Sequence, residues 1–173
     1  WSLVAGQNTL TLAESLTERG FSVVSVMDGE LGSMDRQIFD VEDHVEEALE
    51  VLSDCEIVIA AVGECSADIG EATSKTCLRL SPNQEKLIRS LKEAGKTVIT
   101  LVFSGRPLEI KPVLPYSDAL VQAWFLGSES AAGLTDVLSG DYNPSGRLSM
   151  SFPQTVGQIP VYYNHPWGSA NHQ

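Results

Sequence analysis

Residues 57–62 read IVIAAV, an almost unbroken apolar run between Glu56 and Gly63. A strand that is apolar on both faces is typical of the centre of a parallel sheet that helices cover on two sides. The run therefore predicts a central, buried strand. Ligands bind beyond the carboxyl ends of the strands in such sheets, so the residues after Val62 are the first place to look for chemistry.

Helical and strand patterns alternate on either side of this run. We expect helices at about residues 9–19, 41–52, 81–95 and 128–138, and further strands at residues 21–26, 98–103 and 119–125. Asn8 is the expected N-cap of the first helix and Ser81 that of the third. This alternation predicts an α/β fold with a mostly parallel sheet sandwiched by helices on both faces.

The remaining stretches carry weaker patterns. Residues 28–40 have no clean period and are expected to form a loop. After Gly140 the chain is rich in Gly, Pro, Asn and Ser, which predicts mainly irregular structure with short strand pieces near residues 148–152. Trp124 is expected in the core. Neither a repeat nor a linker divides the chain, so residues 1–173 are interpreted as a single domain.

Negative charge is concentrated in one part of the chain. The 173 residues include 23 acidic and 11 basic side chains, for a formal charge of −12. Residues 28–71 hold fourteen of the acids and one base, Arg36, so this stretch carries −13 and the rest carries +1. A nucleic-acid groove or an anionic membrane surface needs clustered Lys and Arg. No apolar run approaches the ~20 residues that span a bilayer. We therefore expect neither nucleic acid nor a membrane as partner.

The cysteines and the sequence motifs speak against several kinds of site. Three cysteines with no CxxC, and only three histidines, argue against a zinc site or a disulfide scaffold. Cys65 and Cys77 bracket one loop and could pair, although two free thiols are the preferred interpretation. The sequence contains none of the motifs GxGxxG, GxxxxGK[ST] and GxSxG. No motif therefore supports nucleotide binding or a serine nucleophile. We expect no metal and no other cofactor.

The loop that starts at Gly63 is the candidate functional segment. It reads GECSADIGEATSK, is longer than the usual connection in an α/β unit, and carries Glu64, Glu71, Ser74 and Lys75. A glutamate at a strand end can act as a proton donor, and glycoside hydrolysis needs such an acid opposite a second carboxylate. On spacing alone, a solvated loop glutamate is the preferred interpretation.

The last part of the chain adds a resemblance. Residues 140–165, GDYNPSGRLSMSFPQTVGQIPVYYNH, resemble the closing segment of the second domain of glycoside hydrolase family 3, which includes β-glucosidases and exo-glucanases. The similarity extends back through SGRPL at residues 104–108 and GE at residues 63–64 to the opening WS. It implies an α/β sandwich domain of a longer enzyme. The resemblance further implies that the aspartate nucleophile lies on an N-terminal (β/α)₈ barrel, which is expected to be absent from this chain.

The resemblance also implies roles for residues in the loop. Glu64 matches the family's Gly-Glu acid/base and is the expected general acid/base of a retaining hydrolase. Glu71 is the competitor, because EATSK at residues 71–75 is similar to the EASSR stretch of some periplasmic bacterial members. Glu71, Ser74 and Lys75 are also expected to bind substrate, unless Lys75 pairs with a carboxylate instead. Arg106 is expected to brace the acidic loop through an ion pair.

The activity that the resemblance implies is β-glucosidase-like. Such an enzyme hydrolyses terminal non-reducing β-D-glucosyl residues of a β-linked glucoside or oligosaccharide, and its barrel domain is the partner of this domain. A periplasmic or secreted location follows by the same resemblance. The isolated domain is expected to fold and to be inactive. The alternatives are a non-catalytic α/β binding or interaction module on the same scaffold, and a flavodoxin-like cofactor domain.

Overall fold

Three parallel strands form the sheet of the computed structural model, which describes residues 10–26, 44–64, 69–70, 75–162 and 164. They are β1 (Ile57–Gly63), β2 (Thr97–Phe103) and β3 (Ala119–Gln122), in the order β1-β2-β3. β1 pairs with β2 along its whole length, from Ile57 opposite Thr97 to Gly63 opposite Phe103. The three carboxyl ends therefore lie at one edge of the sheet.

The central strand is β2, not β1, in the described sheet, which corrects the expectation drawn from residues 57–62. Four residues of β2 are fully buried (Val98, Thr100, Leu101 and Val102), whereas Ile57 in β1 is 61% exposed. Residues 21–26, the expected strand that could have covered the free side of β1, form no strand. An apolar composition indicates that both faces of a strand are buried. It does not indicate which strands pair with it, and so whether it lies at the centre or at the edge of the sheet.

One face of the sheet packs on α2 (Val45–Val51) and α3 (Pro82–Glu93). Ser81 caps α3 by accepting a hydrogen bond from the backbone N–H of Gln84, as the sequence predicts. Ile88 and Leu91 of α3 are buried in a core that includes Val58 and Val98 of the sheet. The three described acids of α2 (Glu46, Glu47 and Glu50) are exposed, so this part of the negative charge is a solvated surface.

The opposite face packs on α1 (Leu12–Glu18) and α4 (Ser130–Ser139). Thr11, not Asn8, caps α1, and Asn8 lies outside the described residues. Thr11 Oγ1 accepts from the N–H of Glu14, whose carboxylate in turn accepts from the N–H of Thr11. This reciprocal pair starts the helix later than its apolar pattern suggests because it satisfies two of the free donors at the helix end.

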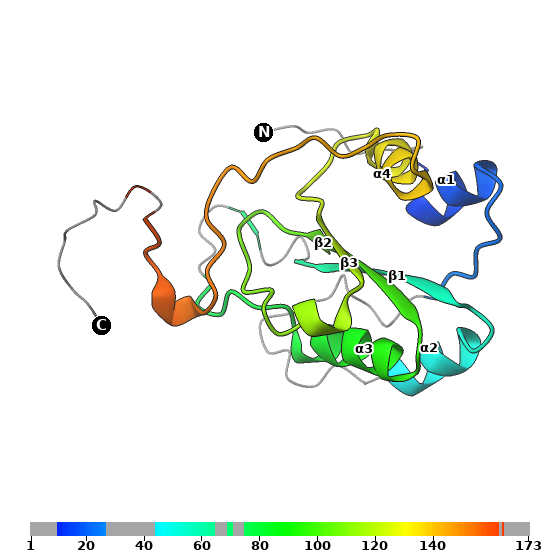
Figure 1. The fold of residues 1–173 in the computed structure, drawn as a ribbon, viewed down its shortest axis with the longest axis horizontal. Helices are drawn as coiled ribbons and strands as arrows, with labels where there is room; N and C mark the ends of the chain where they lie inside the picture. The colour runs from blue at the N-terminus through cyan, green and yellow to red at the C-terminus, as the bar shows by residue number, and fades with distance from the viewer. Residues whose placement is uncertain (1–9, 27–43, 65–68, 71–74, 163, 165–173) are drawn as a thin grey trace.

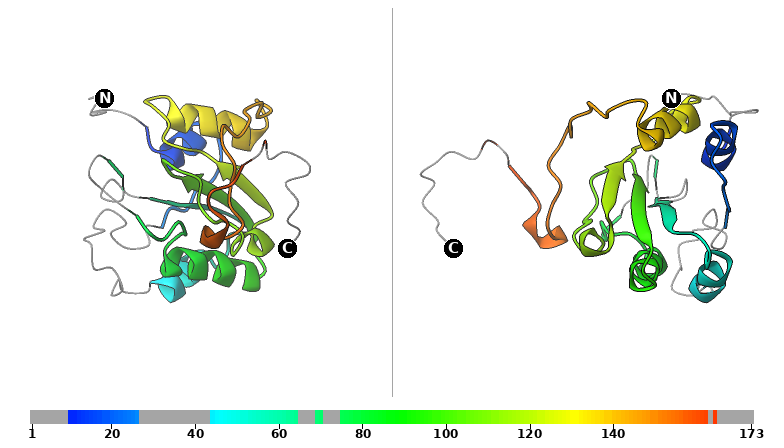
Figure 2. Two further views of the ribbon diagram at one scale, coloured as in Figure 1. Left: turned by 90° about the vertical axis from the view of Figure 1, so that its left-hand side faces the viewer. Right: turned by 45° about the vertical axis from the view of Figure 1, so that its right-hand side comes forward.

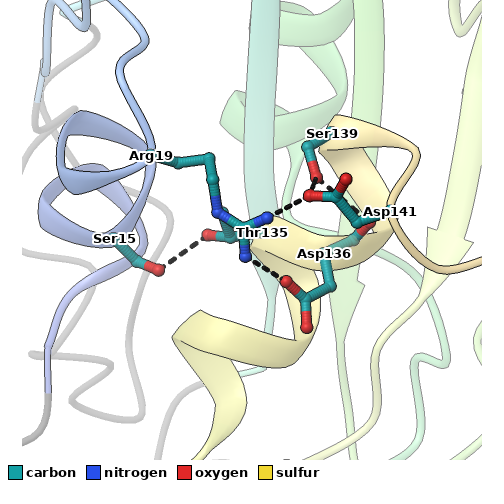
Figure 3. Close-up of polar contacts among 6 residues, drawn as sticks. All are labelled: Ser15, Arg19, Thr135, Asp136, Ser139 and Asp141. Atoms are coloured by element: carbon teal, nitrogen blue, oxygen red, sulfur yellow. Dashed lines mark hydrogen bonds and ion pairs between the residues drawn. The ribbon is translucent and has the colours of Figure 1, made fainter.

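Polar contacts hold α1 and α4 together (Figure 3). The buried hydroxyl of Thr135 donates to Ser15 Oγ at 2.8 Å, and the Arg19 guanidinium pairs with both Asp136 and Asp141. Figures 1 and 2 show the result, with α1 and α4 on one side of the sheet and α2 and α3 on the other. The expected sandwich of helices around a parallel sheet is confirmed.

The chain beyond α4 leaves this body as a long irregular arm, drawn in orange in Figures 1 and 2. The short strand expected near residues 148–152 is not formed, and the regular element in the described part of the arm is the 3₁₀ helix η3 (Val156–Gln158). Another 3₁₀ turn, η2 (Leu114–Tyr116), precedes β3. Trp124 lies just past the end of β3, half-buried, and its ring makes a T-shaped contact with the Phe152 ring, with 5.9 Å between centroids. No helix in the described ranges is long and apolar enough to cross a bilayer.

Candidate functional site

Gly63 sets the backbone at the carboxyl end of β1. Its φ is +148°, and a Cβ placed on it would lie 1.8 Å from the carbonyl oxygen of Phe103. The next residue, Glu64, continues the pairing by donating its N–H to that same oxygen at 2.8 Å. The Gly63 carbonyl accepts from Gln84 Nε2 of α3 at 3.1 Å. A glycine is required here because no side chain fits between the two strands.

The Glu64 side chain is buried among three donors. This side chain is 1% exposed. Oε1 lies 3.2 Å from Lys75 Nζ and 3.2 Å from Arg106 Nε, and Oε2 accepts from the N–H of Gly105 at 3.2 Å. Both oxygens are thus engaged, and two cations compensate the buried charge.

These partners come from two different loops. Lys75 closes the candidate segment that Glu64 opens, and Gly105 and Arg106 follow the end of β2. The expected ion pair between Arg106 and the acidic loop is confirmed, and so is the alternative in which Lys75 pairs with a carboxylate. The side chains of Lys75 and Arg106 are 18% and 28% exposed, so the cluster is covered mainly by protein.

Polar side chains also connect the ends of β2 and β3. Gln122 Nε2 donates to Ser104 Oγ at 3.0 Å, and the Ser104 hydroxyl donates to the Arg106 carbonyl at 2.8 Å. Ser104 is fully buried. Sequence reasoning missed Gln84, Ser104 and Gln122 as parts of this site. The available signal was that Ser104 directly follows a strand and that Gln122 ends one.

Several predicted residues lie outside the described part of the chain. Glu71, Ser74 and Cys65 are among them, so the predicted roles of Glu71 and Ser74 stay predictions. Cys77 is a free, exposed thiol. Within the described ranges, no group of three or more His, Cys, Asp or Glu residues is arranged to hold a metal ion.

A comparison with protein families decides what kind of domain this is. The model of the glycosyl hydrolase family 3 C-terminal domain matches residues 4–173. The chain belongs to glycosyl hydrolase family 3. The resemblance of residues 140–165 and the expected fold class are thereby confirmed. In this family 3 domain, Glu64 and its partners Lys75, Gly105 and Arg106 lie at the carboxyl ends of the strands. Both the general position of ligand sites in parallel sheets and the sequence resemblance point to this place.

Relatives of this family 3 domain carry glycosidase names. It is 42% identical over 121 residues to a periplasmic beta-glucosidase of Salmonella typhimurium, covering 70% of this chain and 16% of that protein. It is 33% identical over 117 residues to a beta-xylosidase of Formosa agariphila, covering 68% of this chain and 16% of that one. The chain therefore spans about a sixth of the length of the curated relatives it matches.

A solved structure supports the assignment of this chain to a domain of a glycosidase. The beta-glucosidase of Listeria innocua, solved in complex with glucose, superposes on this domain with a TM-score of 0.79 at 37% identity. The match covers 95% of this chain and 22% of that protein. The domain is thus similar to one part of a much longer glycosidase.

Proposed function

We propose that this chain is the C-terminal domain of a β-glucosidase-like hydrolase that removes terminal non-reducing β-D-glucosyl residues. Its family membership and the beta-glucosidase names of its relatives support this. The Listeria innocua enzyme has been solved with glucose and, as a mutant, with laminaribiose, which supports a β-linked glucoside or oligosaccharide as substrate. We infer a periplasmic or secreted location, which the name of the Salmonella typhimurium relative supports.

The proposed mechanism is retaining hydrolysis by two carboxylates. A nucleophile attacks the anomeric carbon, and a general acid protonates the leaving oxygen and then activates water. The two carboxyl groups stand about 5–5.5 Å apart in such enzymes. We place the nucleophile on an N-terminal barrel of the same protein, outside this chain, and the acid/base on the segment from Glu64 to Lys75.

The surroundings of Glu64 help to decide whether Glu64 or Glu71 is the general acid/base. A general acid must turn a hydroxyl hydrogen toward the substrate oxygen and must be within reach of it. Glu64 is 1% exposed, and both its oxygens already face donors. This observation favours an anchoring role for Glu64, although its position in the sequence ranks it first. We therefore propose Glu71, the second candidate from the sequence, as the general acid/base.

Substitution of each glutamate in the full-length enzyme tests this assignment. We expect Glu71→Ala to slow hydrolysis of phenyl β-glucoside by about 10²–10⁴-fold, since this leaving group needs a proton. Hydrolysis of 2,4-dinitrophenyl β-glucoside, whose leaving group needs none, should start almost normally. Azide should then restore turnover because it attacks the glycosyl-enzyme without a general base.

The opposite pattern contradicts the assignment. If Glu64→Ala shows the leaving-group dependence and the azide rescue while Glu71→Ala does not, Glu64 is the acid/base. If neither variant loses activity on either substrate, the proposed catalytic role of this segment is wrong.

A further inference from the structure

We propose that Glu64 is a positioning residue whose carboxylate ties both ends of residues 64–75 to the end of β2. This inference rests on the proposed function, because the segment that it positions is the one that carries the proposed acid/base. Four described residues make the cluster: Glu64, Lys75, Gly105 and Arg106. Its geometry carries the inference in three steps.

The first step is that the cluster closes the segment upon itself. Glu64 opens the segment and Lys75 ends it, eleven positions later, and their side chains meet at 3.2 Å. A loop of this length is costly to hold in one conformation because its backbone entropy must be offset. The ion pair fixes the two ends of the segment relative to each other.

The second step is that the closed loop is attached to the sheet. The Gly105 N–H and Arg106 Nε hold the carboxylate from the strand next door. Ser104 and Gln122 fix residues 104–106 in turn through hydrogen bonds to the end of β3. Just past the segment, the Leu78 carbonyl accepts from the N–H of Glu109, again in the loop after β2.

The third step is a contact from within the segment itself. A Cβ added at Gly105 would lie 3.7 Å from Ile69 Cγ2 and 3.0 Å from Phe125 Cε2. Ile69 thus comes close to the same short stretch of backbone that donates to Glu64. The segment is attached at its beginning, at its end and at Ile69. Loss of the carboxylate would remove the contacts that join the two ends of the segment to Gly105 and Arg106.

The experiment is steady-state kinetics of full-length Glu64→Gln on two aryl β-glucosides. We expect kcat to fall by about 10- to 100-fold, since small misplacements of a catalytic group cost this much. The fall should be greater for the phenyl than for the 2,4-dinitrophenyl leaving group, because the displaced segment carries the proposed proton donor, and it should be smaller than the fall in Glu71→Ala. Lys75→Arg and Arg106→Lys, which keep the charges, should retain more activity than Lys75→Met and Arg106→Met.

The matched control is Glu85→Gln in α3. Glu85 is another largely buried carboxylate, paired with Arg79 at 2.6 Å, and no hydrogen bond or ion pair joins it to the described residues of the segment. Its loss should lower Tm while leaving kcat unchanged. Wild-type kcat in Glu64→Gln overturns the proposal, and so does a leaving-group-dependent loss in Glu64→Gln when Glu71→Ala shows none. If Glu64→Gln does not fold, Lys75→Met is judged by the same criteria.

Hydrogen exchange separates this inference from the proposed function. Amides of residues 65–75 should exchange at least tenfold faster in Glu64→Gln than in the wild type or in Glu85→Gln. If the enzyme cleaves no β-glucoside at all, the proposed function fails, yet this exchange result still decides whether Glu64 holds the segment. Unchanged exchange would overturn the anchor even in an active enzyme.

Discussion

Gly63 and Glu64 are adjacent, yet different forces constrain them. Gly63 is constrained by space, because the Phe103 carbonyl occupies the place of a side chain. Glu64 is constrained by charge, because its buried carboxylate needs the donors that surround it. Together they direct the chain out of the sheet at one defined point. The Gly-Glu pair that the sequence resemblance singles out is thus explained by structure before any chemistry is considered.

Substitution of Gly63 by alanine tests the steric constraint. We expect Gly63→Ala to lower the free energy of unfolding by more than about 3 kcal/mol, because the new Cβ overlaps a strand backbone. Urea denaturation of the full-length protein measures the change. The control is Gly133→Ala in α4, where nothing lies within 4 Å of the new Cβ. That substitution should raise stability by about 1 kcal/mol, as alanine replaces glycine within a helix. A Gly63→Ala protein of normal stability would refute the strand contact.

At the scale of elements, a few side chains join helices to the sheet. Asp118, just before β3, accepts from Lys92 of α3 at 2.7 Å and from the N–H of Val98 in β2 at 2.8 Å. The hydrogen bond from Lys92 holds the pKa of Asp118 below its ordinary value of 3.8, and the hydrogen bond from Val98 acts in the same direction. One carboxylate therefore links three elements at the amino-terminal side of the sheet.

The lowered pKa of Asp118 predicts how this link depends on pH. The folded state binds its proton more weakly than the unfolded state, so the contribution is complete above the unfolded value of about 3.8. It is lost as the pH falls through the lower folded value. Asp118→Asn should therefore be less stable than the wild type at pH 7, and the difference should shrink below pH 4. Denaturant titrations at pH 7, 4 and 3 measure this. A difference that stays constant with pH would contradict the prediction.

At the scale of the whole molecule, the chain combines a closed body with an extended arm. The body buries its two apolar cores on either side of the sheet. The arm touches the body near the carboxyl ends of the strands, where the N–H of Val156 donates to Glu109 at 3.0 Å. Several large apolar side chains of the arm are exposed, among them Leu148, Ile159 and Tyr162. The arm thus runs along the edge of the sheet at the carboxyl ends of the strands, which is also where the Glu64 cluster lies.

The proposed division of labour predicts that this chain alone hydrolyses no β-glucoside. Double displacement needs two carboxylates, and the proposed nucleophile lies outside these 173 residues. We expect a folded protein by circular dichroism with no release of p-nitrophenol from its β-glucoside. The full-length protein, assayed in parallel, should be active. Turnover by the isolated chain at a rate near that of the full-length protein would show that the proposed nucleophile is not needed.

Local patterns in the sequence determined the elements of this protein. The apolar runs at residues 57–62 and 98–103 predicted β1 and β2, and Ser81 marked the start of α3. The position of the functional segment also followed, because the rule for parallel sheets needs only the end of a strand. These features depend on neighbours within a few residues, which a sequence displays directly.

Only the tertiary structure decided the neighbours of each element and the partners of Glu64. β1 lies at an edge of the described sheet because residues 21–26 form no strand beside it. Glu64 has its carboxylate occupied because folding brings Gly105 to it from forty-one positions away. Spacing in a sequence shows which face of an element is buried, but contacts between distant segments depend on how the elements pack. The same glutamate can therefore look like an acid in the sequence and serve as an anchor in the fold.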